Sequence, residues 1–121
     1  MGRPVYESFT LGFADYVRQN IDLRALQSWG VEALKQNPGT SGTISLKSDQ
    51  LPSFVKNVWP LKSTSYSIET RADTGHRCVQ ILSGGGFHHW GVLVGAPNLQ
   101  IESVRNFYCI ILSPGVYVFS D

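Results

Sequence analysis

The residues best suited to chemistry lie together in the segment 83–95, which reads Ser-Gly-Gly-Gly-Phe-His-His-Trp-Gly-Val-Leu-Val-Gly. Glycine accepts positive φ and lets a backbone approach another backbone or a ligand closely. The two histidines supply groups that transfer protons or bind metals, and the aromatic rings supply surface for stacking. We therefore assign the candidate ligand-binding residues to this segment: Phe87, His88, His89 and Trp90.

A small enzyme is the alternative interpretation of the same region. His76 and Cys78 lie two residues apart in a strand-like run, so their side chains project to one face, where an imidazole can activate a thiol. His89 is a third candidate acid or base, with Cys78 or Asp73 as its partner. No nucleophile-elbow motif accompanies Cys78, and the S-x-x-K match at residues 53–56 fits a short apolar helical turn better. The pattern favours a buried Cys78 thiol over a His/Cys or His/Asp site.

Phosphate and metal binding both find little support in this segment. Phosphate-binding glycine loops lead into a helix N-terminus, whereas the residues after Gly86 have the pattern of a strand, so we predict a tight strand connection. A metal needs three or four converging ligands, but His88 and His89 point to opposite faces of a strand. We predict neither a metal site nor a cofactor.

The run Gly84–Gly91 also supports a resemblance, together with the preceding strand Val79–Leu82 and the dipeptide Leu51-Pro52. It resembles a group of small planctomycete-type bacterial proteins that carry a GGGF-x-H-[WF]-G motif near the end of a short domain. The likeness covers roughly residues 20–121, and His88 occupies the variable position of the motif. It implies a bacterial protein, and no family activity, cofactor or site residue follows from it.

Composition limits the remaining classes of function. The 121 residues are 42% hydrophobic and 16% charged, which suits one core and a single domain over 1–121. Ten basic and nine acidic residues are scattered, so nucleic acid is not an expected partner. No apolar run approaches the roughly 18 residues of a membrane span, and the start lacks the apolar region of a signal peptide. We expect a soluble, cytoplasmic protein without a membrane partner. Cys78 and Cys109 lack C-x-x-C spacing, so we expect both to be buried thiols.

Hydrophobic periodicity in the first half predicts helices. The first is a short one that carries Phe9, Phe13, Tyr16 and Val17 on one face. A second helix is capped by Asp22 and runs to about Gln36, where Asn37-Pro38-Gly39 ends it. A strand-like run follows at 42–46, and then a short helical turn at 48–58.

In the second half the period changes to two, which predicts strands. We expect them near 64–71, 77–82, 88–94, 107–112 and 116–119, with turns at 72–75 and at Ser113-Pro114-Gly115. The predicted class is α+β: short N-terminal helices packed on one face of a mainly antiparallel sheet of about five strands.

The later strands are apolar on both faces, so the second face of the sheet needs a cover. The helical turn Phe54–Val58, a second subunit or a ligand would each provide one, and a homodimer is the simplest. We therefore predict a non-enzymatic interaction or small-ligand-binding module that self-associates through an apolar sheet face, with a small molecule or another protein as a further partner.

Overall fold

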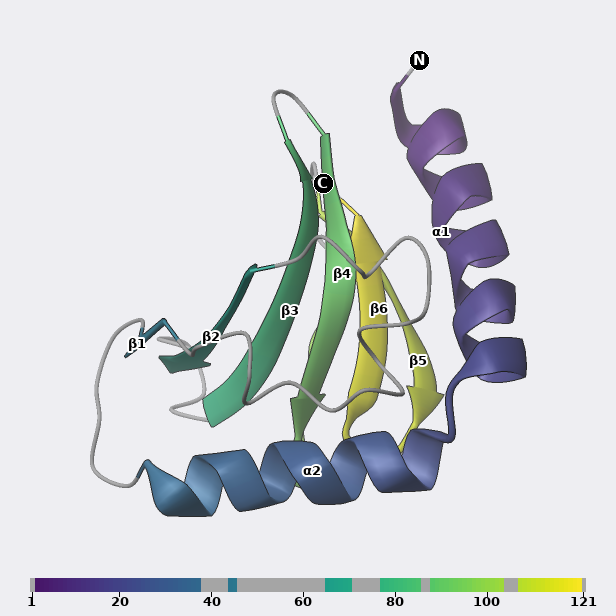
Figure 1. Cartoon of the computed structure of the whole chain (residues 1–121). Helices are drawn as coiled ribbons and strands as arrows, with labels where there is room; N and C mark the ends of the chain where they lie inside the picture. The colour runs from purple at the N-terminus through teal and green to yellow at the C-terminus, as the bar shows by residue number, and fades with distance from the viewer. Residues whose placement is uncertain are drawn as a thin grey trace.

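The structure is a computed structural model that describes residues 2–37, 44–45, 65–70, 77–85, 88–103 and 107–120. Two helices come first in the chain, α1 (Gly2–Asn20) and α2 (Leu23–Gln36), and strands follow (Figure 1). The strands are β1 (Ile44–Ser45), β2 (Ser65–Thr70), β3 (Arg77–Gly85), β4 (His88–Gly95), β5 (Tyr108–Ser113) and β6 (Val116–Ser120). The predicted α+β class is confirmed. The expected helical turn at 48–58 and the turn at 72–75 lie outside the described residues.

Every strand pair in the described part of the sheet is antiparallel, and the strand order is β1-β2-β3-β4-β6-β5. Five of these strands match the five predicted for the second half, and β1 lies within the strand-like run predicted at 42–46, although it is only two residues long. β6 follows β5 in the chain but pairs with β4, so it lies between β4 and β5. This places β5 at the opposite end of the sheet from β1.

The Asp22 cap sets where α2 begins. Its carboxylate oxygen Oδ1 accepts hydrogen bonds from the backbone N–H groups of Arg24 (3.0 Å) and Ala25 (3.1 Å), which a helix start otherwise leaves without intrahelical acceptors. The helix ends at Gln36, as the Asn37-Pro38-Gly39 sequence predicts. α1 is longer than the short helix we expected, since Gly12 does not interrupt it.

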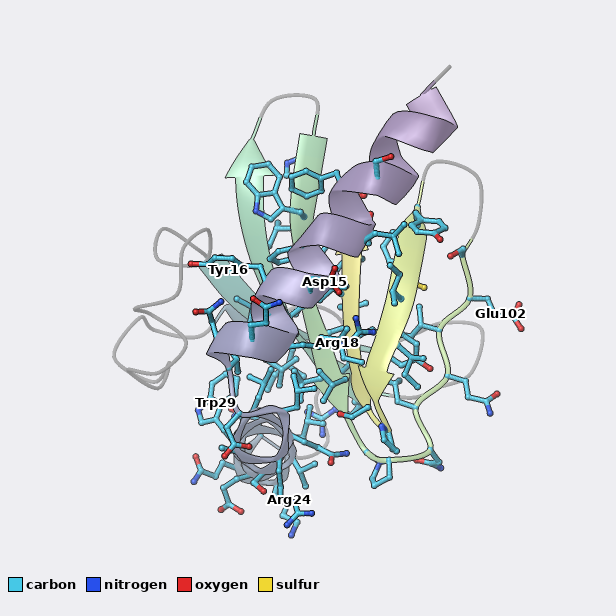
Figure 2. All side chains as sticks on the ribbon, turned by 90° about the vertical axis from the view of Figure 1, so that its right-hand side faces the viewer. Asp15, Tyr16, Arg18, Arg24, Trp29 and Glu102 are labelled. Atoms are coloured by element: carbon cyan, nitrogen blue, oxygen red, sulfur yellow. The ribbon has the colours of Figure 1, made fainter. Side chains whose placement is uncertain are left out.

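Both helices lie on one face of the sheet. α1 runs beside the strands and packs on β5 and β6, whereas α2 crosses below and packs on β3 and β4 (Figure 1). In Figure 2, α1 passes in front of the sheet and α2 is seen end-on beneath it. The buried residues of this helix-side core are Phe13, Ala14, Val17, Ile21, Leu26, Ile81, Val92, Val94, Val116 and Val118.

Gly30 lets α2 lie close to β4. A Cβ at this position would overlap Cγ1 of Val94 and lie 3.0 Å from its Cβ. Val94 is fully buried, so it has no room to move away. The glycine that looks unfavourable within a predicted helix is therefore required by the packing of that helix.

The opposite face of the sheet is covered by the chain itself. The connection after β4, the 96–103 segment, buries Leu99 and Ile101 against residues of the sheet. The hydroxyl of Tyr117 donates a 3.0 Å hydrogen bond to the carbonyl oxygen of Leu99 and so holds the segment in place. The buried sheet residues beneath are Cys78, Leu93, Tyr117 and Phe119. This segment is a cover that the sequence analysis did not consider, and Phe54–Val58 lies outside the described residues.

The hairpin between β5 and β6 turns at Pro114-Gly115, as predicted, with Gly115 at φ 82°. Proline followed by glycine at positive φ is the signature of a type II turn. The register shifts between Ile111 and Ser113, so Leu112 is an extra residue on β5 and forms a bulge. The bulge shifts the register of β5 just before the turn, where Ser113 still pairs with Val116.

Candidate functional site

The first two glycines of the triplet belong to the end of β3, next to the connection to β4. β3 extends to Gly85, so Gly84 and Gly85 are strand residues that pair with His89 and His88. Residues 86–87 lie outside the described part of the chain, and Phe87 with them. A strand follows the glycines, as predicted, so their amides do not converge at a helix N-terminus in the manner of a phosphate loop.

His89 and Trp90 do not share a surface. Trp90 lies half-buried on the helix side, where its ring centroid is 5.4 Å from that of Phe9 in α1. His89 is also half-buried, but strand alternation places it on the opposite face with Leu93. The side chain of His88 is outside what the structure describes. Two of the four candidate ligand-binding residues are therefore on opposite sides of the sheet, and a single small ligand reaches one of them at most.

The last glycine of the motif has a packing role. A Cβ at Gly91 would overlap the carbonyl oxygen of Ile81 in the neighbouring strand and lie 3.0 Å from Cε1 of Phe119. Backbone approaches this close require glycine. The motif is thus explained in part by how β4 fits between β3 and β6.

Among the catalytic candidates, Cys78 lies in β3 and is fully buried beneath the 96–103 segment. Both cysteines are thiols, and Cys109 is half-buried. His76, Asp73 and the S-x-x-K match at 53–56 lie outside the described residues. A thiol closed off from solvent meets no substrate in this conformation, so its position agrees with the buried-thiol interpretation.

The described residues contain neither a cluster of metal ligands nor a helix that could span a membrane. Among them, no group of three or more His, Cys, Asp or Glu side chains is placed to hold a metal ion. Neither α1 nor α2 combines the length and apolar character needed to cross a bilayer.

The surface that sequence reasoning missed is the outer edge of β5. The backbone N–H of Cys109 donates to Oγ of Ser103 at 3.0 Å, and the same hydroxyl donates to the carbonyl oxygen of Cys109 at 3.3 Å. Ser103 belongs to the 96–103 segment and not to β6, so these backbone groups point away from β6. Ser103 therefore caps the open edge of the sheet at Cys109. Glu102, its neighbour, points away from the sheet in Figure 2.

Ile111 is the next residue of β5 whose backbone N–H and C=O groups point away from β6, because these groups alternate in direction along a strand. Its side chain is 52% exposed, one of the large hydrophobic side chains that the described surface leaves open to solvent. The other is Leu11 on α1, at 55%. β5 carries no charged residue, so Ile111 belongs to an uncharged edge strand.

No protein-family model matches the chain, and neither a curated protein nor a solved structure does. The resemblance to the bacterial GGGF-x-H-[WF]-G proteins thus rests on the motif residues and stays a prediction. The fold itself defines the class: two helices on one face of an antiparallel sheet whose other face is covered by the β4–β5 connection.

Proposed function

We propose that the protein is a non-enzymatic interaction module that self-associates, and that the outer edge of β5 at Ile111 is its pairing surface. The observation that supports this is an exposed isoleucine on an uncharged edge strand. Edge strands present backbone donors and acceptors to other chains, and β5 has no charged side chain to block such pairing; its bulge at Leu112 begins only after Ile111. The proposed setting, a bacterial cytoplasm, rests on the sequence.

The helix-free sheet face is a weaker candidate for the pairing surface than the edge. Its residues Leu93, Tyr117 and Phe119 are already buried by the 96–103 segment, so a second subunit gains little apolar area there. Ile111 lies on the same face but remains half exposed. The self-association predicted from apolar strands is therefore best assigned to the end of the sheet.

A second copy of the chain fits this edge by symmetry. Two antiparallel strands are related by a two-fold axis, so β5 of one protomer and β5 of its partner can pair without any other complementary surface. With the axis at Ile111, its N–H donates to the carbonyl of Ile111 of the partner subunit, and the reverse bond forms as well. The two isoleucine side chains then lie side by side, and no charge on β5 opposes the approach.

The test is Ile111→Lys, with Leu11→Lys as the matched control, because the two residues are almost equally exposed. A lysine on the edge introduces like charges that would face each other across the two-fold axis. In sedimentation velocity at micromolar concentration, we expect a dimer for the parent and for Leu11→Lys, and a monomer for Ile111→Lys. A monomeric parent, or an Ile111→Lys variant that dimerises as well as the parent, overturns the proposal.

A further inference from the structure

We infer that the 96–103 segment is a lid, which opens as a unit while the sheet beneath it stays folded. Opening uncovers the apolar side chains of Leu93, Tyr117 and Phe119, which are buried on the sheet face opposite to the helices. The segment therefore controls access to that face. This inference is independent of the proposed pairing at Ile111, because it concerns one chain alone.

Side chains alone hold the segment on the sheet. Among the described residues, its one backbone–backbone hydrogen bond runs within the segment, from the N–H of Leu99 to the carbonyl oxygen of Ala96 at 2.9 Å. The strands beneath are joined to one another by ladders of such bonds. Leu99 and Ile101 are its buried residues, and the others are exposed. A region with few buried contacts and no ladder bonds opens at a lower free energy than the whole fold.

The segment is fastened at two points on different strands. At the first, Leu99 packs directly on Gly95, where a Cβ would lie 3.0 Å from Cδ2 of the leucine, and its carbonyl oxygen accepts the Tyr117 hydroxyl at 3.0 Å. At the second, Oγ of Ser103 accepts the backbone N–H of Cys109 at 3.0 Å. A short continuous chain links the two points, so release of one weakens the other, and the segment opens as one unit.

Native-state hydrogen exchange tests whether the lid opens without the sheet. The Cys109 amide reports on the lid, because its acceptor is the Ser103 hydroxyl. The amides of Val92 and Val118 report on the sheet, because both residues lie in strands that are paired on both sides. Below the unfolding transition, exchange at Cys109 should rise less steeply with urea than at the two valines, since the open lid exposes less surface than the unfolded chain. Equal urea dependence at the three amides overturns the inference.

A hydroxyl deletion tests whether the two fastening points open together. Tyr117→Phe removes the donor to Leu99 and should accelerate exchange of the Cys109 amide by about fivefold, although the acceptor of that amide is unchanged. Tyr108→Phe is the matched control, since it removes a hydroxyl from the residue next to Cys109 but on the helix side of β5. It should leave exchange at Cys109 unchanged. Unchanged exchange at Cys109 in Tyr117→Phe shows that Ser103 moves alone and overturns the lid.

A cavity on the other side of the sheet completes the test. Val17 is fully buried in the helix-side core, so Val17→Ala lowers the stability of the whole fold without touching the lid. We expect exchange at Val92 and Val118 to accelerate at least tenfold in this variant, and exchange at Cys109 to stay as in the parent. Equal acceleration at all three amides means that the segment opens only when the protein unfolds, and overturns the inference.

Discussion

The hydroxyl oxygens of Thr10 and Ser120 lie 2.6 Å apart in the core, where α1 packs on β6. Both side chains are fully buried, and they join positions that are 110 residues apart in the chain. A hydrogen bond between two hydroxyls holds only while their oxygens stay within about 3 Å, whereas apolar contacts tolerate sliding. The pair therefore fixes the position of α1 along the sheet face on which it packs.

The first prediction concerns the coupling of these two hydroxyls. Thr10→Val and Ser120→Ala should each lower the free energy of unfolding by about 1–3 kcal/mol, because each leaves a buried hydroxyl without its partner across the interface. The double variant should lose less than the sum of the two, since neither hydroxyl then remains to be satisfied. Urea unfolding of the four proteins measures the coupling energy, and simple additivity would contradict the prediction.

The second prediction compares two helical glycines. Gly30→Ala should destabilise the protein by about 1–3 kcal/mol, because the new methyl group overlaps Val94 and forces α2 away from β4. Gly12→Ala is the control: a Cβ there meets nothing within 4 Å, so the better helix propensity of alanine should stabilise α1 by about 0.5–1 kcal/mol. Opposite signs in urea unfolding are expected, and a gain of stability at both positions would show that α2 does not approach β4 so closely.

The third prediction concerns thiol accessibility. In the native protein, a thiol reagent such as dithiobisnitrobenzoate should modify the half-buried Cys109 and leave the fully buried Cys78 intact. The Cys109→Ser variant should then show no native reactivity, while both thiols of the parent react in urea. Rapid modification of Cys78 in the folded Cys109→Ser variant would contradict this prediction and support the enzyme interpretation, in which Cys78 is the nucleophile.

Local sequence signals were enough to predict most elements. The Asp22 cap and the Asn37-Pro38-Gly39 stop predict α2 to within a residue, because both act through backbone groups only a few positions away. Likewise, Pro114-Gly115 predicts the β5–β6 turn, since its geometry is set within four residues. These interactions are short-range, so the sequence pattern carries them directly.

The candidate site was less predictable because its features depend on distant parts of the chain. The sequence shows that β5 is apolar, but its place at the sheet end follows from β6 pairing with β4. The cap on Cys109 comes from Ser103, whose neighbourhood has no recognisable motif. Strand alternation predicted opposite faces for the adjacent histidines. The same rule applied to His89 and Trp90 would have predicted from the sequence that these two candidate ligand-binding residues lie on opposite faces of the sheet.

The position of β6 also has a consequence for protein synthesis. β5 leaves the ribosome before β6, yet within the described sheet it pairs only with β6, so it has no neighbouring strand until Val116–Ser120 emerge. α1 precedes β5 and β6 in the chain and packs on both, so its apolar face has no sheet to pack on until these strands emerge. Only two residues separate β5 from β6, so β5 is unpaired briefly, whereas the apolar stripe of α1 stays without its sheet partners until Val116–Ser120 emerge. A chain of this topology should depend on chaperones that bind apolar segments during synthesis.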